Sequence, residues 1–189
     1  MIKTIEYLDG RVRMIDQTRL PLEKVFVDCK TIDDVANAIK TMVIRGAPAI
    51  GVSAAMGVSL GAESIQVDDF ETFYSELEDK CSVLAKSRPT AVNLKWGIER
   101  MKRVARESKS LSIPELKKKL KQEALDICKE DIAANMTMGD FGQTLINDGS
   151  TILTHCNAGA LATAGFGTAL GVIRAAVNAG KKIEVLKKA

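Results

Sequence analysis

The segment of the sequence with the most distinctive chemistry centres on Cys156, which lies between His155 and Asn157. A short apolar strand is predicted just before it at residues 151–153, and a Gly/Ala-rich stretch that predicts a helix follows. The N-terminal end of a helix stabilises a nearby thiolate, and the free backbone N–H groups at such a turn bind anions. We therefore expect a chemical site at Cys156. His155 is not implied as its partner, because neighbouring side chains of an extended segment point to opposite sides.

Two further segments each place one arginine in a turn. Arg45 begins the stretch RGAPAIG, in which small residues let a ligand approach the backbone and the guanidinium suits a phosphate. Arg88 lies in SRPTAVNL, which predicts a turn between helices with exposed amides at the start of the second helix. The structural alternatives are an Arg45 that pairs with a surface acid and an Arg88 that is solvated beside a capped helix. Together with the Cys156 turn, the two segments favour a site for an anionic ligand.

The other three cysteines, Cys29, Cys81 and Cys128, fall on apolar faces of predicted elements, and we expect them to be small core residues. All four cysteines are far apart and none forms a C-x-x-C pair. This spacing argues against a zinc site or a disulfide framework and favours reduced thiols.

The elements that must position these residues change in character along the chain. A hairpin is predicted at residues 4–8 and 12–15 around the turn Asp9-Gly10, with a third strand at 25–27. Capping boxes are predicted at Thr31 with Asp34 and at Ser112 with Glu115. Hydrophobic spacing and small-residue content predict helices at residues 32–43, 49–62, 70–84, 90–108 and 112–146.

From residue 151 the pattern is that of one β-α-β unit, with a helix at about 165–178 and a second strand at 182–186. We therefore predict an α/β fold. A mostly helical N-terminal domain with a small β-hairpin start would cover residues 1–145, and the incomplete start of a Rossmann-like parallel-sheet domain would cover 146–189. Because two parallel strands cannot cover both faces of a sheet or its edges, exposed apolar surface is expected there.

The bulk composition excludes several classes of partner. The 189 residues carry a formal net charge of +3, which is too small to predict nucleic-acid binding, and 4% aromatic residues provide no stacking platform. No signal peptide and no apolar stretch of membrane-spanning length is recognisable. We expect a cytoplasmic protein with no nucleic-acid or membrane partner.

At the three segments around Arg45, Arg88 and Cys156 the chain resembles the methylthioribose-1-phosphate isomerase family. That family is related to the alpha, beta and delta subunits of translation initiation factor 2B and to ribose-1,5-bisphosphate isomerase. The resemblance extends from Ile2 to the strand ending at Val185. It implies that Arg45, Gly46 and Ala47 contact the substrate, that Arg88 binds its phosphate, and that Cys156 is the catalytic cysteine.

The resemblance also implies a reaction, the aldose–ketose isomerisation of 5-methylthioribose 1-phosphate to 5-methylthioribulose 1-phosphate in methionine salvage. Because the anomeric oxygen is esterified, the ring C1–O4 bond must break, which calls for an acid at the ring oxygen. Hydrogen then moves from C2 to C1 through an enediol or as a hydride, with Cys156 as a proton shuttle or a polarising group. Neither metal nor organic cofactor is needed, and the full-length protein is expected to be a homodimer.

The family's remaining functional residues, which are a substrate-binding Gln, a catalytic Asp and an Asn-Lys pair, have no counterpart in the 189 residues. The chain therefore looks truncated, and we expect it to be inactive alone. Alternatives stay open at this point: a regulatory subunit of the same family that binds a sugar phosphate or nucleotide without catalysis, a ribose-1,5-bisphosphate isomerase, or an inactive fragment. Cys156 argues against the regulatory subunit, and a second phosphate would need more basic groups than the two arginine turns supply.

Overall fold

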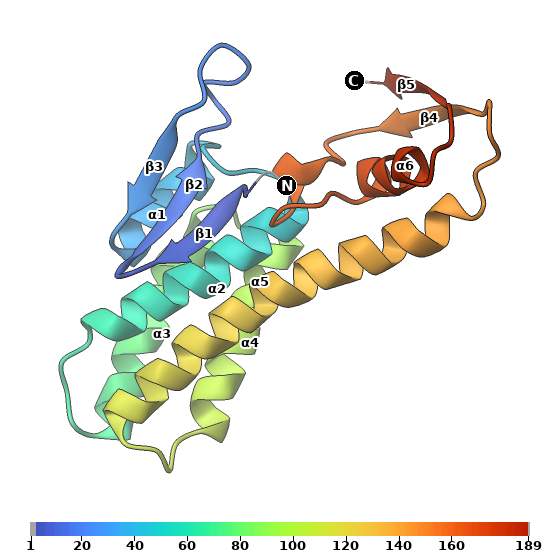
Figure 1. Cartoon of the computed structure of the whole chain (residues 1–189). Helices are drawn as coiled ribbons and strands as arrows, with labels where there is room; N and C mark the ends of the chain where they lie inside the picture. The colour runs from blue at the N-terminus through green and yellow to red at the C-terminus, as the bar shows by residue number, and fades with distance from the viewer. Residues whose placement is uncertain (1–2, 189) are drawn as a thin grey trace.

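The computed structural model describes residues 3–188 and combines a bundle of long helices with two small sheets (Figure 1). Ile2, where the resemblance begins, lies outside the described residues, as do Met1 and Ala189 at the outer ends of the two predicted domains. The predicted α/β class is confirmed, because antiparallel strands open the chain and a small parallel sheet closes it. The domain boundary near residue 145 stays a prediction.

The first sheet consists of β1 (Ile5–Leu8), β2 (Arg11–Ile15) and β3 (Phe26–Cys29), in that spatial order and all antiparallel. The predicted hairpin is confirmed, and its turn places Gly10 at a φ of 66°. The third strand begins one residue later than predicted. Helix α1 (Ile32–Lys40) follows and has the predicted capping box of Thr31 and Asp34.

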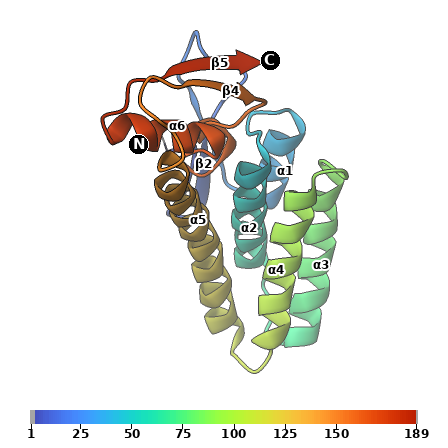
Figure 2. The same ribbon diagram turned by 90° about the vertical axis from the view of Figure 1, so that its right-hand side faces the viewer.

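Helix α2 (Ala47–Ser64) is the centre of the bundle, and every residue from Ala49 to Ala62 is buried. Figure 2 shows α5 (Ile113–Gln143) on one side of α2, with α4 (Val92–Glu107) and α3 (Phe70–Lys86) on the other. Small residues make this close packing possible. A Cβ on Gly97 of α4 would lie 2.6 Å from the Gly51 carbonyl oxygen of α2, so the two backbones approach without intervening side chains.

Several predicted helix ends are wrong by a few residues. Helix α1 ends at Lys40 instead of residue 43, because Met42 adopts a left-handed φ of 63°. Helix α4 has Ala91 and not Thr90 as its N-cap, with no side-chain cap. Helix α5 ends at Gln143 instead of residue 146, although its capping box of Ser112 and Glu115 is confirmed.

The last unit is the predicted β-α-β, made of β4 (Thr151–His155), α6 (Ala169–Asn178) and β5 (Glu184–Lys188). The two strands pair in parallel, with Leu153 opposite Leu186. The C-terminal part of α5 supports this unit, since Gly142 packs against Val172 of α6. As expected, large apolar side chains of the small sheet are exposed, including Leu153, of which 70% is accessible. Within residues 3–188, no helix is both long enough and apolar enough to cross a membrane.

Candidate functional site

Cys156 follows the last residue of β4 directly and has a left-handed φ of 68°. Its side chain is exposed, and no hydrogen bond joins it to His155 within the described residues. Residues 156–168 form the Gly-rich turn expected after the thiol, here called the thiol loop, with only a three-residue 3-10 helix (Ala160–Ala162). Helix α6 follows at Ala169, four residues later than predicted. Stabilisation of the thiolate by a helix N-terminus stays a prediction.

The other three thiols have a different environment, as predicted. Burial raises the pKa of Cys29 to about 11 and that of Cys81 to about 12. Burial also raises the pKa of the half-buried Cys128 to about 11. These thiols stay protonated near neutral pH, whereas Cys156 alone among the four is exposed to a reactant.

The turn that contains Arg45 lies directly against the thiol loop. Gly46 is the N-cap of α2 and has a φ of 100°, which L side chains rarely adopt. A Cβ on Gly46 would lie 2.3 Å from the Ala162 Cα, so any side chain there would push the two segments apart. The fold thus brings together two of the three segments that the sequence singled out, although they are far apart in the chain.

Gln17 joins the same two segments and was not among the predicted site residues. Its Nε2 donates to the Leu161 carbonyl oxygen of the thiol loop at 2.7 Å, and its Oε1 accepts from Arg45 Nε at 3.4 Å. The side chain is almost completely buried, with 5% exposed. Both ends of one amide are therefore used to hold the arginine and the loop in a fixed relation. Gln17 falls within the sequence stretch that carried the resemblance, but nothing in the sequence indicates these two contacts.

Arg88 lies apart from this contact, in the turn between α3 and α4. Figure 2 shows that turn at the same end of the bundle as the start of α2. Arg88 lines a cavity of about 320 Å³ between the two helices, together with Lys86 and Lys95. Within residues 3–188, neither Arg88 nor Arg45 has a carboxylate within salt-bridge distance. Both guanidinium groups therefore remain available to an anion.

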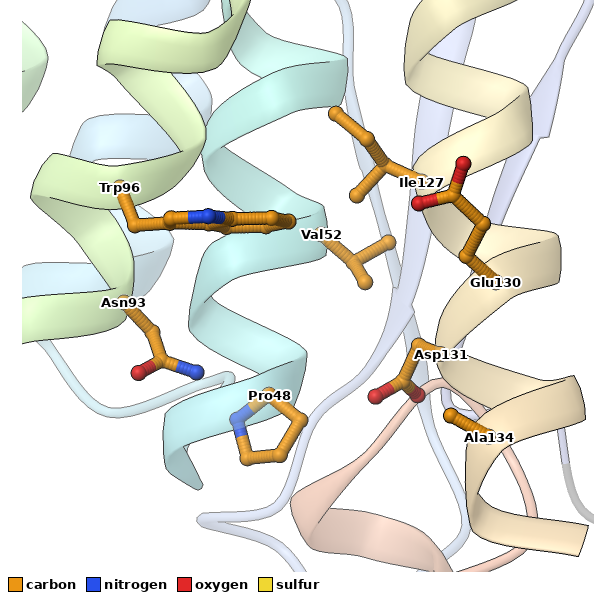
Figure 3. Close-up of a pocket in the computed structure, with 8 residues that line it drawn as sticks. All are labelled: Pro48, Val52, Asn93, Trp96, Ile127, Glu130, Asp131 and Ala134. Atoms are coloured by element: carbon orange, nitrogen blue, oxygen red, sulfur yellow. The ribbon is translucent and has the colours of Figure 1, made fainter. Parts of the chain in front are cut away.

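A larger cavity of about 390 Å³ opens beside the first turns of α2, between α4 and α5 (Figure 3). Trp96 and Asn93 of α4 face Glu130 and Asp131 of α5 across it, and Pro48 of α2 closes one side. None of the predicted site residues lines this cavity.

Asp131 connects that cavity to the thiol loop. Its Oδ2 accepts a hydrogen bond from the Ala164 backbone N at 2.7 Å, and its Oδ1 accepts from Asn135 Nδ2 at 3.1 Å. Burial raises the pKa of Asp131, while the bonds from Ala164 and Asn135 partly offset that effect. Sequence reasoning missed this residue because Asp131 follows two other charged residues on α5, a pattern that is typical of a solvated helix face.

The wall of the cavity is braced by an ion-pair cluster. Arg100 of α4 donates to Glu123 at 2.6 Å and to both oxygens of Glu130 at 2.5 Å and 2.8 Å, all on α5. The guanidinium carbon also lies 5.6 Å from the ring centroid of Trp96. Among residues 3–188, no group of three or more His, Cys, Asp or Glu side chains is arranged to hold a metal ion.

Residues 43–188 match the model of the initiation factor 2 subunit family. Curated relatives named methylthioribose-1-phosphate isomerase include those of Citrifermentans bemidjiense, 56% identical over 97% of this chain, and Geobacter sulfurreducens, 57% identical over 97%. The chain spans about half the length of these relatives, 53% in both cases.

Two solved structures are similar over 99% of the chain. One is 5-methylthioribose 1-phosphate isomerase from Pyrococcus horikoshii, 33% identical with a TM-score of 0.91, of which 60% is covered. The other is the delta subunit of translation initiation factor eIF-2B from A. fulgidus, 40% identical with a TM-score of 0.87, of which 54% is covered.

Proposed function

The chain belongs to the initiation factor 2 subunit family, and from that premise we propose that it provides part of the active site for converting 5-methylthioribose 1-phosphate to 5-methylthioribulose 1-phosphate. The name shared by relatives at 56% identity supports this reaction. The observation that supports the proposal most is the contact between Gly46 and Ala162, because the turn that contains Arg45 lies against the loop that begins with the thiol.

In this proposal each residue of the site has a separate role. Arg45 and Arg88 bind the phosphate, since two guanidinium groups without carboxylate partners offer bidentate donors to an anion. The exposed backbone beside Gly46 and Ala47 lets the sugar lie close to the start of α2. Cys156 acts near C1 and C2 as a proton shuttle or polarising group once the C1–O4 bond of the ring has opened. We expect the acid at the ring oxygen to be the family's catalytic Asp, which has no counterpart in the 189 residues.

We also propose a cellular context for this activity. The reaction belongs to methionine salvage, and the protein acts in the cytoplasm, where its four unpaired thiols stay reduced. We further propose that the full-length protein is a homodimer. Exposed apolar side chains on α5 and after it, such as Phe141 at 73% and Leu145 at 85%, support an interface of some kind. Light scattering on the full-length protein tests this, and a monomer at micromolar concentration would contradict it.

A regulatory role is a second candidate, and one observation favours it. A structure that is 40% identical over almost the whole chain is named as a subunit of a translation initiation factor. Such a protein would bind a sugar phosphate or nucleotide at the same arginine turns without turning it over.

An assay with two protein components separates the two candidates. The chain is incubated with 5-methylthioribose 1-phosphate, alone and together with the C-terminal half of a curated relative, and formation of the ketose is followed. We expect turnover in the mixture and none in the chain alone. Binding of the substrate by calorimetry without turnover in the mixture would overturn the isomerase proposal and favour the regulatory role.

A further inference from the structure

The thiol loop has no regular α-helix to hold it, so its shape depends on anchors supplied from elsewhere in the fold. Two neutral side chains hold carbonyl oxygens of its first half: Thr4 donates to Ala160 at 2.7 Å, and Gln17 donates to Leu161 at 2.7 Å. Its second half is held from α5, where Asp131 accepts from the Ala164 backbone N at 2.7 Å. A fourth anchor is Arg174 of α6, which donates through Nη1 to the Phe166 carbonyl oxygen at 3.0 Å. Among these four outside anchors, Asp131 is the acidic one and the one that holds a backbone N–H.

The carboxylate of Asp131 is itself held in place. Asn135, of which 5% is exposed, donates through Nδ2 to Asp131 Oδ1 at 3.1 Å and to the Asp131 carbonyl oxygen at 2.8 Å. Each carboxylate oxygen therefore has one N–H donor, and the side chain cannot rotate without losing both bonds. A charge-assisted bond to a backbone N–H is stronger than a neutral one and fixes the amide that it holds.

Contacts within the loop connect Ala164 to the segment that follows Cys156. The buried Thr163 Oγ1 accepts from Gly165 N at 3.2 Å and from Gly167 N at 3.0 Å, which makes this part of the loop one rigid turn. A Cβ on Gly167 would lie 2.8 Å from the Gly159 carbonyl carbon, so the turn presses directly on the segment that follows the thiol. A shift at Ala164 must therefore displace the backbone a few residues after Cys156.

That segment is closed by a further pair of backbone bonds. The Ala158 carbonyl oxygen accepts from Thr168 N at 2.9 Å and from Leu170 N at 3.2 Å, which ties the start of the loop to the first turn of α6. The segment that begins at Ala158, two residues after Cys156, is thus held between α6 and the turn that Asp131 holds.

We propose that Asp131 is a positioning residue that fixes the Cys156 thiol through the backbone amide of Ala164. It does not touch the reacting atoms, and it acts from α5 across the boundary between the helical bundle and the β-α-β unit. The consequence for catalysis rests on the proposed function. The positional effect does not, because the thiol can be observed in the 189-residue chain itself.

The experiment measures alkylation of each cysteine by iodoacetamide under native conditions, read by mass spectrometry of peptides. The variants are Asp131→Ala, Asp131→Asn as a change of similar volume, and Asp140→Asn as a matched control, because Asp140 is an exposed acid on the same helix. In Asp131→Ala we expect the alkylation rate of Cys156 to change by at least about threefold. The change should be in the direction of the rate measured for Cys156 in the urea-unfolded chain. A smaller shift in the same direction is expected for Asp131→Asn, and none for Asp140→Asn.

Cys29 and Cys81 are internal monitors of global unfolding, because both are buried. If they become reactive together with Cys156, Asp131 supports the whole fold and the proposal is overturned. Unchanged rates at all four cysteines in Asp131→Asn and Asp131→Ala would overturn it as well.

Amide hydrogen exchange tests the connecting step. Loss of the bond from Asp131 should make the Ala164 amide exchange at least about tenfold faster in Asp131→Ala than in the unchanged chain. Faster amide exchange at Ala164 with an unchanged alkylation rate at Cys156 would show that a displacement of Ala164 does not move Cys156. That result would contradict the proposal. Since neither measurement needs turnover, failure of the isomerase assay would leave this test intact.

Discussion

At the residue scale, Gln17 shows how a single buried amide can couple two functional segments. Its donor and acceptor ends are both used, one by the Leu161 carbonyl oxygen and the other by Arg45. Removing such a side chain leaves a polar group without its partner, which costs about 1–3 kcal/mol when that group is buried.

We expect Gln17→Met, a change of similar volume, to lower the free energy of unfolding by about 1–3 kcal/mol. The mixture of this chain with the C-terminal half of a curated relative is here called the assembled enzyme. In the assembled enzyme Gln17→Met should also raise KM about tenfold, because Arg45 loses the contact that orients it. Urea unfolding and steady-state kinetics measure the two effects. Gln66→Met is the control, since Gln66 is exposed. An unchanged KM would show that Gln17 has no part in substrate binding.

Arg88 should contribute mainly to binding. Loss of a charge-assisted contact to phosphate is worth about 1.5–3 kcal/mol, so Arg88→Ala should raise KM about 10- to 100-fold with little change in kcat. Arg88→Lys should restore part of the affinity, because a point charge replaces the bidentate fork. Arg103→Ala is the control, since the Arg103 side chain on α4 is 61% exposed. Equal KM values for Arg88→Ala and the unchanged protein would exclude a phosphate contact.

Asp131 should leave a signature in the pH dependence of stability. Burial raises its pKa in the folded state, so the folded protein binds this proton more tightly than the unfolded chain does. The contribution of this tighter proton binding to the free energy of unfolding is fully present below the pKa of about 4 that Asp131 has in the unfolded chain. It is lost as the pH rises through the pKa of Asp131 in the folded protein. The unchanged chain should therefore gain stability relative to Asp131→Asn between pH 7 and pH 4. Chemical unfolding at both pH values measures the difference, and a gain for Asp131→Asn on acidification would contradict the assignment.

The sequence indicated only those candidate site residues that stand out in a short local motif. Arg45 among small residues and Cys156 in a predicted turn are visible as short motifs. Gln17 and Asp131 hold the thiol loop through Leu161 and Ala164, which lie 144 and 33 residues away in the sequence, so their local sequence carries no sign of the role.

At the element scale, the position of α2 determines the site, because its N-cap Gly46 meets the thiol loop and its interior packs directly on α4. The second contact depends on Gly97, whose missing side chain lets the Gly51 carbonyl approach. A side chain there would meet backbone, which cannot move aside as a flexible side chain can.

Gly97→Ala should therefore destabilise the protein by about 1–3 kcal/mol, since overpacking forces the backbone to shift. Gly61→Ala on α2 is the matched control. Its Cβ would be 3.1 Å from Ile32 Cδ1 and 3.4 Å from Lys80 Cδ, both near the ends of side chains that can adjust, and alanine gains up to about 1 kcal/mol in helix propensity. Thermal or urea unfolding of both variants measures the contrast. Equal stability of the two variants would show that the α2–α4 contact tolerates a methyl group.

Helices and strands were predictable where local signals are strong. Hydrophobic spacing located α3 and the capping boxes located the starts of α1 and α5, because these signals act within one turn of helix. The start of α6 was wrong by four residues. The Gly-rich stretch before it is held as a loop by bonds to Thr4, Gln17 and Asp131, and no local propensity reports such contacts.

At the scale of the whole molecule, α5 joins the helical bundle to the β-α-β unit. Its first half packs in the core, and its second half supports α6 through Gly139, which lies against Gly171 and Ala175, and Gly142, which lies against Val172. Asp131 lies between these halves, so the helix that links the two parts also holds the thiol loop. The parallel sheet beyond it keeps Leu153 and Leu186 exposed, which leaves apolar surface available to a partner.

The most direct test of the central claim is the kinetic effect of Cys156→Ser in the assembled enzyme, with substrate binding measured separately by calorimetry. If Cys156 acts at the reacting carbons, kcat should fall about 10²- to 10⁴-fold while the substrate Kd changes less than about threefold. Cys128→Ser is the control, because Cys128 is half-buried and lies outside the thiol loop. A Cys156→Ser enzyme that turns over at a rate comparable to the unchanged enzyme would contradict the account.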